Sequence, residues 1–251
     1  MKTIIIFLLL LNSISGITQT IEETAQDFWK ATAIRNNPII VEKGEQLIFY
    51  LEKNKLEIDS TVISIRLFTA NGYSNMSNYT RSLEINLQTL EIIEKVFGKE
   101  HPSYVTSLNN LALDYSDLGD YKKALEYNLL ALKIKDKLGG KKSQSYAMSV
   151  NNLAVNYSNL GDYNKALEYN FLALEIYEKV FGKENPSYAS SLGNLASNYS
   201  YLGDFNKALE YNLLALKIRE KVVGKEHPSY AICLNNIASD YSDLGDFKKA
   251  L

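Results

Sequence analysis

The stretch that decides the fold runs from Ser145 to Pro186 and reads SYAMSVNNLAVNYSNLGDYNKALEYNFLALEIYEKVFGKENP. Residues 187–228 repeat it, with 31 of 42 positions identical. The same pattern precedes it at 103–144 and follows it at 229–251 as a truncated copy. Self-similarity at a fixed period of this length is typical of a repeat architecture. The chain is therefore expected to form one array of stacked units.

The apolar residues within one copy have the spacing of a helix. Leu108, Leu111 and Ala112 lie at i, i+3 and i+4, on one helical face. The tripeptide 118–120, Leu-Gly-Asp, ends that helix, because glycine supplies the left-handed stop and aspartate can cap the next helix. The copy thus predicts two helices with a tight turn between them. The remaining residues expected to face the core are Tyr115, Tyr121, Ala124, Tyr127, Ala131 and Ile134.

The rest of the chain follows the same frame with decreasing regularity towards the N-terminus. Residues 61–102 align without gaps as a diverged repeat, and 19–60 are expected to form a degenerate helical hairpin that caps the stack. Its two helices are expected near 21–35 and 41–54, separated at Asn36-Asn37-Pro38. The predicted organisation is 1–18, 19–60, 61–102, 103–144, 145–186, 187–228 and 229–251.

Residues 1–18 have the pattern of a secretory signal peptide. Lys2 is followed by eight uninterrupted apolar residues, Ile4 to Leu11, and then by small and polar residues. The apolar run is shorter than the roughly 20 residues that span a bilayer. We expect cleavage between Ser15 and Gln19 and an exported mature chain, periplasmic or extracellular.

Composition argues against several classes of function. The net charge of −2 gives no basic excess for nucleic acid or an anionic membrane. Cys233 is the only cysteine, and the two histidines, His101 and His227, share one repeat position before a proline. No phosphate loop, metal cluster or nucleophile with a base is recognisable. We expect no catalytic activity, no metal and no cofactor, and we interpret the charges of GDYNKALEY as a solvated helix face.

The pattern resembles the tetratricopeptide repeat, at the residues Leu108, Leu111, Ala112, Tyr115, Ala124 and Ala131. Its 42-residue period is longer than the usual 34. It is similar to the longer variant of kinesin light chains and many bacterial proteins, with LNNLA in the first helix and GKEHP in the connection. The resemblance covers 61–251. It implies an all-α fold, a right-handed superhelical solenoid of stacked antiparallel helix hairpins.

The resemblance also implies that the first helices line a concave groove that holds an extended peptide. The amides among the groove positions are the main candidates, since an amide both donates and accepts hydrogen bonds. The alternative is that one asparagine of each pair bonds a neighbouring helix. The candidate residues are Asn109, Asn110, Asn151, Asn152, Asn194, Asn235 and Asn236, with Ser116, Ser158 and Ser200. Further groove positions are Thr106, Leu113, Ser149, Val155, Ser190, Gly193, Ser197, Ile232, Ser239 and Ser242.

Three asparagines of the second helices depart from the family pattern. Asn128, Asn170 and Asn212 occupy a position that is usually bulky or apolar, so they either form a polar ladder between repeats or lie nearer the surface. The glycosylation pattern occurs at 75–77, 78–80, 156–158 and 198–200, and the last two, with Asn156 and Asn198, are generated by the repeat itself.

These observations favour a non-catalytic scaffold that binds a protein or peptide ligand. An alternative hypothesis is the sensory or adaptor front of a larger signalling protein, such as a histidine kinase or a caspase-like protease, with its effector beyond residue 251. A third hypothesis is end-to-end self-association, because the truncated last copy leaves an apolar edge. No nucleic acid and no small-molecule cofactor are expected as partners.

Overall fold

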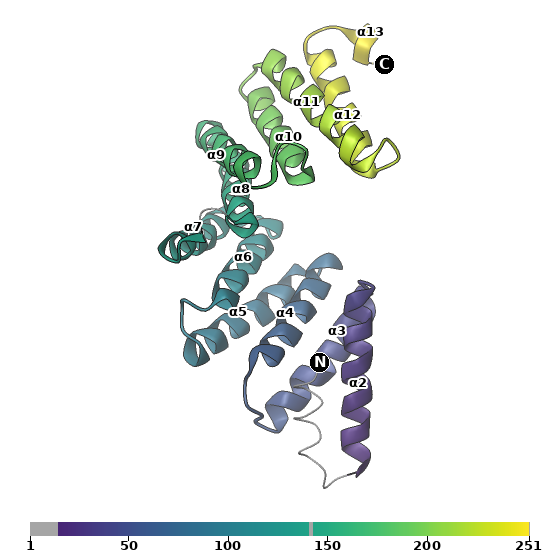
Figure 1. Cartoon of the computed structure of the whole chain (residues 1–251), viewed down its shortest axis with the longest axis vertical. Helices are drawn as coiled ribbons and strands as arrows, with labels where there is room; N and C mark the ends of the chain where they lie inside the picture. Colours follow the sequence, from purple (N-terminus) through teal and green to yellow (C-terminus); the bar gives the residue numbers. More distant parts are fainter. Residues whose placement is uncertain (1–14, 141–142, 251) are drawn as a thin grey trace. The chain divides into compact units, whose positions relative to one another are not determined.

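The computed structural model describes residues 15–140 and 143–250, and the side chains from residue 21 onward. These residues form helices and turns, with no strand in the described ranges. The helices are α2 (Ser15–Ala33), α3 (Asn37–Lys53), α4 (Ser60–Asn75), α5 (Tyr79–Val96), α6 (Pro102–Asp117), α7 (Tyr121–Lys137), α8 (Gln144–Asn159), α9 (Tyr163–Phe181), α10 (Pro186–Tyr201), α11 (Phe205–Val223), α12 (Pro228–Asp243) and α13 (Phe247–Ala250) (Figure 1).

The helices divide into two compact units, residues 1–120 and 121–251. In the first unit, each helix from α2 to α6 packs against the next one in the chain. In the second unit the same holds from α7 to α13, and α8 also contacts α10. Within each unit, Figure 1 shows consecutive helices as antiparallel neighbours. The expected all-α fold of stacked helix hairpins is confirmed. The border between the units falls inside the predicted repeat 103–144.

Helix boundaries keep the 42-residue frame along the whole described chain. The first helices end at residues 33, 75, 117, 159, 201 and 243, each 42 positions after the one before. The second helices begin at 37, 79, 121, 163, 205 and 247 with the same spacing. The frame therefore extends through the N-terminal pair α2 and α3, although few of its residues match the regular copies.

The core consists of an apolar stripe on each first helix together with buried alanine and larger apolar residues of the second helices. Leu108, Leu111 and Ala112 are buried on α6, as their helical spacing predicts. Ala124, Ala166 and Ala208 are fully buried on the second helices, where a larger side chain would separate the paired helices. Burial of this apolar surface is the main favourable term in folding.

At two junctions, a buried polar pair joins a second helix to the first helix of the next copy. Asn86 Nδ2 donates to Asp114 Oδ2 at 2.7 Å, and Asn212 Nδ2 donates to Asp240 Oδ2 at 2.7 Å. The same two frame positions hold Asn128 with Asn156 and Asn170 with Asn198, all at most 2% exposed. Of the two alternatives for Asn128, Asn170 and Asn212, burial therefore excludes a surface position.

The first junction replaces this polar pair with two glycines, Gly44 and Gly72. A Cβ atom on Gly44 would lie 2.0 Å from Thr69 Oγ1, and one on Gly72 would lie 2.9 Å from Val41 Cγ1. The absence of both side chains therefore permits a close approach of α3 and α4.

Burial also bears on glycosylation, because the buried amides of Asn156 and Asn198 cannot accept a glycan in the folded chain.

The charges of the GDYNKALEY segment have a structural role that the sequence interpretation missed. Lys165 Nζ lies 5.2 Å from the ring centroid of Tyr157 and 3.2 Å from Asp162 Oδ2. The ring of Tyr157 stacks on Tyr169 with centroids 5.3 Å apart. Lys207, Tyr199 and Tyr211 repeat the arrangement one copy later. The interpretation as a merely solvated face is wrong, since the cation covers the aromatic pair that joins the two helices of a copy.

The predicted signal peptide lies mostly outside the described residues. Residues 1–14 are not described, and 15–18 fall in the first turns of α2. Among the helices that are described, none combines the length and the hydropathy needed to cross a membrane.

Candidate functional site

The candidate residues occupy three frame positions on the first helices. The position of Asn110, Asn152, Asn194 and Asn236 is half-buried in every copy. The position of Ser116, Ser158 and Ser200 is also half-buried. At the remaining position, Asn109 and Asn151 are half-buried and Asn235 is exposed. That these residues contact a ligand stays a prediction.

Asn151 takes part in a hydrogen-bond network between neighbouring first helices. Its Oδ1 accepts from Ser191 Oγ at 3.0 Å and from Asn194 Nδ2 at 3.2 Å. The structure thus brings together two of the candidate residues, Asn151 of α8 and Asn194 of α10. Asn151 behaves as the helix-bonding member of its pair, which leaves Asn152 as the better candidate for ligand contact.

The prediction that Ser149 faces the groove is wrong. Ser149 is 1% exposed, and its hydroxyl accepts a hydrogen bond from Lys135 Nζ at 2.8 Å. The frame position of Thr106 is held in this copy by Met148, which is 51% exposed and lies 42 residues after Thr106. Burial lowers the pKa of Lys135 to about 8, and its ammonium also donates to the carbonyl oxygen of Ser145 at 2.6 Å.

The two histidines and the cysteine have structural positions. His101 Nδ1 accepts from the backbone N–H of Ser103 at 3.2 Å, and His227 Nδ1 accepts from that of Ser229 at 3.1 Å. Both histidines therefore act as N-caps, of α6 and of α12. Cys233 is buried, and burial raises the pKa of its thiol. No group of three metal-ligating side chains occurs within the described ranges.

A cavity of about 530 Å³ lies on the first-helix face of the N-terminal unit. Phe68 and Asn71 of α4 line it, and they occupy the frame positions of Asn110 and Leu113. Arg35 contributes the only charged side chain in its lining, from the turn between α2 and α3. The other lining residues are Thr32, Asn37, Ile40, Gly72 and Asn75.

Arg35 has a backbone conformation that disfavours a side chain. Its φ is +55°, and the same frame position holds glycine at Gly119, Gly161 and Gly203. A non-glycine residue in this region costs roughly 1 kcal/mol. Arg35 forms no ion pair in the part of the chain that the structure describes. Its guanidinium is therefore available on the wall of the cavity.

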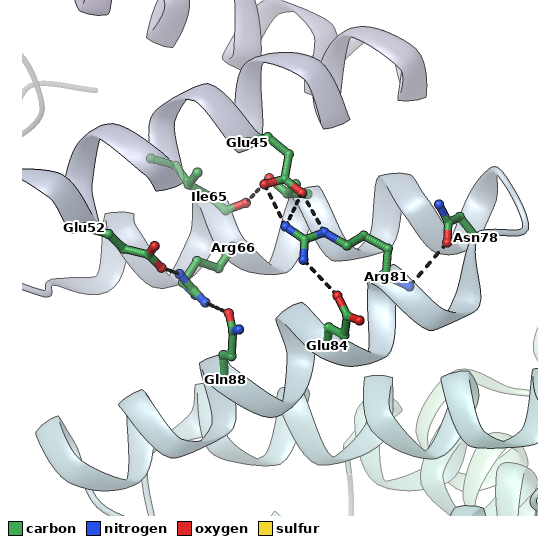
Figure 2. Close-up of polar contacts among 9 residues, drawn as sticks. Glu45, Glu52, Ile65, Arg66, Asn78, Arg81, Glu84 and Gln88 are labelled. Atoms are coloured by element: carbon green, nitrogen blue, oxygen red, sulfur yellow. Dashed lines mark hydrogen bonds and ion pairs between the residues drawn. The ribbon is translucent and has the colours of Figure 1, made fainter.

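A second polar site lies among α3, α4 and α5 of the same unit. Arg66 is 2% exposed and donates to Glu52 Oε1 at 2.8 Å, to Gln88 Oε1 at 2.7 Å and to Thr89 Oγ1 at 3.1 Å. Figure 2 shows its guanidinium between Glu52 and Gln88. The four side chains link all three helices.

Arg81 forms a neighbouring cluster with two carboxylates. Its Nε and Nη2 donate to the two oxygens of Glu45 at 2.9 Å and 3.0 Å, and its Nη1 donates to Glu84 at 2.8 Å (Figure 2). These carboxylates raise the pKa of Arg81 above its ordinary value. Both clusters border a cavity of about 430 Å³, which Ile48, Phe49, Ile85, Glu91 and Ile92 also line.

Sequence reasoning missed both cavities because it treated residues 19–102 as degenerate copies. The repeat frame contains the missing signal. Arg66 falls on the core position of Leu108, Val150 and Leu192, and Glu45 falls on an apolar position. The sequence thus shows a charged residue, Arg66, at a core position. It does not show which residues neutralise that charge.

The known proteins agree with this architecture. The family model for the tetratricopeptide repeat matches residues 64–137 and 145–221. The chain belongs to the tetratricopeptide repeat family. No curated protein sequence matches it significantly.

Solved structures of other tetratricopeptide-like proteins share the fold. A Podosopora anserina protein described as a kinesin light chain with nearly identical repeats is 27% identical, with a TM-score of 0.66 over 78% of this chain and 92% of that one. BtubC from P. vanneervenii is 22% identical, with a TM-score of 0.68 over 94% and 87%. A Rap protein in complex with competence and sporulation factor is 18% identical, with a TM-score of 0.62 over 89% and 69%. The last two likenesses concern the fold alone.

Proposed function

We propose that this tetratricopeptide repeat protein is a non-catalytic scaffold that binds a protein or peptide partner on the face formed by its first helices. The observation that carries the proposal is the cavity of about 530 Å³ at Phe68, Asn71 and Arg35. Two of its lining residues, Phe68 and Asn71, lie at frame positions that sequence reasoning assigned to the groove. Proteins of this repeat family are typically interaction scaffolds, and the Rap structure above holds competence and sporulation factor.

The side chains of this cavity suit an extended peptide. Asn71 and Asn75 carry amides that can both donate to and accept from a peptide backbone. Phe68, 43% exposed, offers apolar surface for a ligand side chain, and its ring meets Trp29 edge-on at 5.9 Å. The strained Arg35, which forms no ion pair with the described residues, would attract a partner group with a negative charge. The asparagine and serine positions of α6 would continue the contact along the same face.

The signal-peptide pattern of residues 1–18 places this activity outside the cytoplasm in our proposal. A fusion of residues 1–30 to alkaline phosphatase, which is active only after export, would test that part by itself. Export is expected, and retention of an inactive fusion in the cytoplasm would contradict it.

Site-specific photo-crosslinking tests the binding face. We would replace Phe68 with p-benzoylphenylalanine, which preserves an aromatic ring at that position, and irradiate cells that produce the full chain. The control places the same residue at Lys217, an exposed position on the second helix α11. We expect a discrete crosslinked species from position 68 and none from position 217. Arg35→Gly, which introduces the residue of the regular copies, is expected to weaken that crosslink. Equal crosslinking from both positions would contradict the proposal.

A further inference from the structure

The cavity among α3, α4 and α5 reverses the pattern of the repeat. Where the regular copies have buried leucine or valine, Arg66 is buried. Where they have exposed lysine or glutamate, at Lys133, Glu175 and Lys217, this unit has Phe49 with 66% of its surface exposed. Local violations of an otherwise consistent pattern are expected at functional sites. Both departures line the same cavity.

The arginines of this cavity have little capacity left for a ligand. All three nitrogens of Arg81 donate to Glu45 or Glu84, and all three of Arg66 donate to Glu52, Gln88 or Thr89. Their positive charges are therefore matched by carboxylates within the structure. An anionic ligand would have to displace these contacts.

The carboxylates, in contrast, have acceptor capacity to spare. Glu91 forms no ion pair in the part of the chain that the structure describes. Glu52 uses Oε1 for Arg66 and its side chain is 62% exposed. The charged side chains lining the cavity are Glu45, Glu52, Glu91, Arg66 and Arg81, which leaves a net negative charge. The lining thus favours a group that donates hydrogen bonds and carries a positive charge.

The apolar part of the cavity suits the carbon chain of such a group. Ile48 and Ile85 are buried in the lining, and Ile92 and the ring of Phe49 are accessible beside them. The ring already attracts a cation, because Lys53 Nζ lies 5.8 Å from its centroid. An incoming cation can use the other face of the ring or displace Lys53.

From this geometry we infer that the cavity among α3, α4 and α5 binds a basic side chain, arginine or lysine, of a partner protein. The cation pairs with Glu91 and Glu52, its carbon chain lies along Ile48 and Ile92, and Phe49 covers it. The residues that would contact the cation lie on the second helices α3 and α5, and none of them lines the cavity of the proposed function. The exposure of Phe49 means that the cavity opens to solvent, as a side chain attached to a larger partner requires.

Binding of model compounds tests the ligand class. The full chain, labelled with ¹⁵N, would be titrated with N-acetyl-arginine amide and, separately, with N-acetyl-glutamate amide. We expect saturable shifts in the amide signals of residues 45–53 and 85–92 with the arginine compound only. Saturable binding of the glutamate compound instead, or no binding of either at 50 mM, would overturn the inference.

Matched variants test the residues. Glu91→Gln is expected to weaken binding of the arginine compound about three- to tenfold, as loss of one partly exposed charge partner should. Glu175→Gln alters the same frame position in a regular copy and should leave the affinity unchanged. Phe49→Lys introduces the residue of Lys133 and Lys217 and should abolish binding. An unchanged affinity in Phe49→Lys would contradict the site.

A stability measurement separates this role from a purely structural one. Arg66→Leu places the core residue of the regular copies at this position. Replacing a buried charge by a well-packed apolar residue is often neutral or stabilising, and the Glu52 carboxylate left behind is largely solvated. We expect a denaturation midpoint at least equal to that of the parent chain, together with binding of the arginine compound that is kept or tighter, because Glu52 loses its internal partner. Lost binding at an unchanged midpoint would contradict the pairing of the cation with Glu52.

The source of the cation needs a separate comparison. A twelve-residue peptide with one central arginine should bind more tightly than N-acetyl-arginine amide, since a partner protein contributes contacts around the cavity. If the peptide binds no more tightly than the amide, the site takes free guanidinium compounds and the assignment to a partner is wrong.

Discussion

At the scale of single residues, the buried contact between Asn86 and Asp114 differs from its counterparts in other copies, and the difference has a predictable cost in stability. Burial raises the pKa of Asp114 to about 6, although the hydrogen bond from Asn86 acts in the opposite direction and lowers this pKa. The Oδ1 atom of Asn86 is buried and has no hydrogen-bond partner. A protonated carboxyl group at Asp114 can donate to that oxygen, whereas a carboxylate cannot. The equivalent position in the next two copies is an amide, Asn156 and Asn198, which has a donor at every pH.

Asp114→Asn is therefore expected to stabilise the protein near neutral pH. The folded-state pKa lies above the unfolded value of 3.8, so the parent chain loses stability as the pH rises from about 4 to about 6. Each pKa unit corresponds to about 1.4 kcal/mol, which limits the loss to about 3 kcal/mol. Chemical denaturation at pH 4 and pH 7.5 should show a higher midpoint for the variant only at pH 7.5. The exposed Asp243→Asn provides the control, and a variant destabilised at pH 7.5 would contradict the argument.

At the scale of helices, one frame position caps every first helix from α4 onward, with four residue types among five helices. Asp59, His101, Ser143, Asn185 and His227 follow one another at intervals of 42, and each side chain accepts a backbone N–H of its helix. The chemistry of the cap thus varies while its geometry is kept, because any short side chain with an acceptor can satisfy an otherwise unpaired N–H.

This cap predicts a graded series at Asn185, whose Oδ1 accepts from the backbone N–H of Ser187 at 2.8 Å. Asn185→Ala is expected to lower the free energy of unfolding by about 1 kcal/mol, and Asn185→Asp or Asn185→Ser to lower it by much less. Hydrogen exchange of the first turn of α10 would report the change locally. Equal loss in all three variants would mean that the acceptor has no role.

Helix ends were predictable from the sequence because they depend on local residues that recur in each copy, such as the glycine and the cap. The sequence prediction placed Ser149 on the exposed face, where the structure has Met148. The error is a shift of one residue, which on a helix moves a side chain from the exposed face to the core. The contacts of Arg66 were not predictable either. They join residues 14 to 23 positions apart, on three helices whose packing a single sequence does not specify.

At the scale of the whole molecule, the preserved frame makes a copy removable. Deleting residues 145–186 joins Gln144 to Ser187 and keeps the interface chemistry, because Lys135 would meet Ser191 in place of Ser149 and Asn128 would meet Asn198 in place of Asn156. Each copy of such an array contacts only its neighbours, so the shortened chain should fold. We expect an unchanged mean residue ellipticity at 222 nm and a lower denaturation midpoint, since one interface is lost.

A deletion of half a copy, residues 145–165, provides the contrasting case. It removes the first helix α8 with the start of α9, so the second helix α7 would be followed by the remainder of another second helix. The remainder of α9 would then lack the apolar stripe of α8 that packs against it, and α7 would lose the helix that buries its apolar face. This variant should lose helicity and cooperative unfolding. If both deletions behave alike, the 42-residue frame is not the unit of stability, and the correspondence between copies on which both proposed sites rest would carry no energetic meaning.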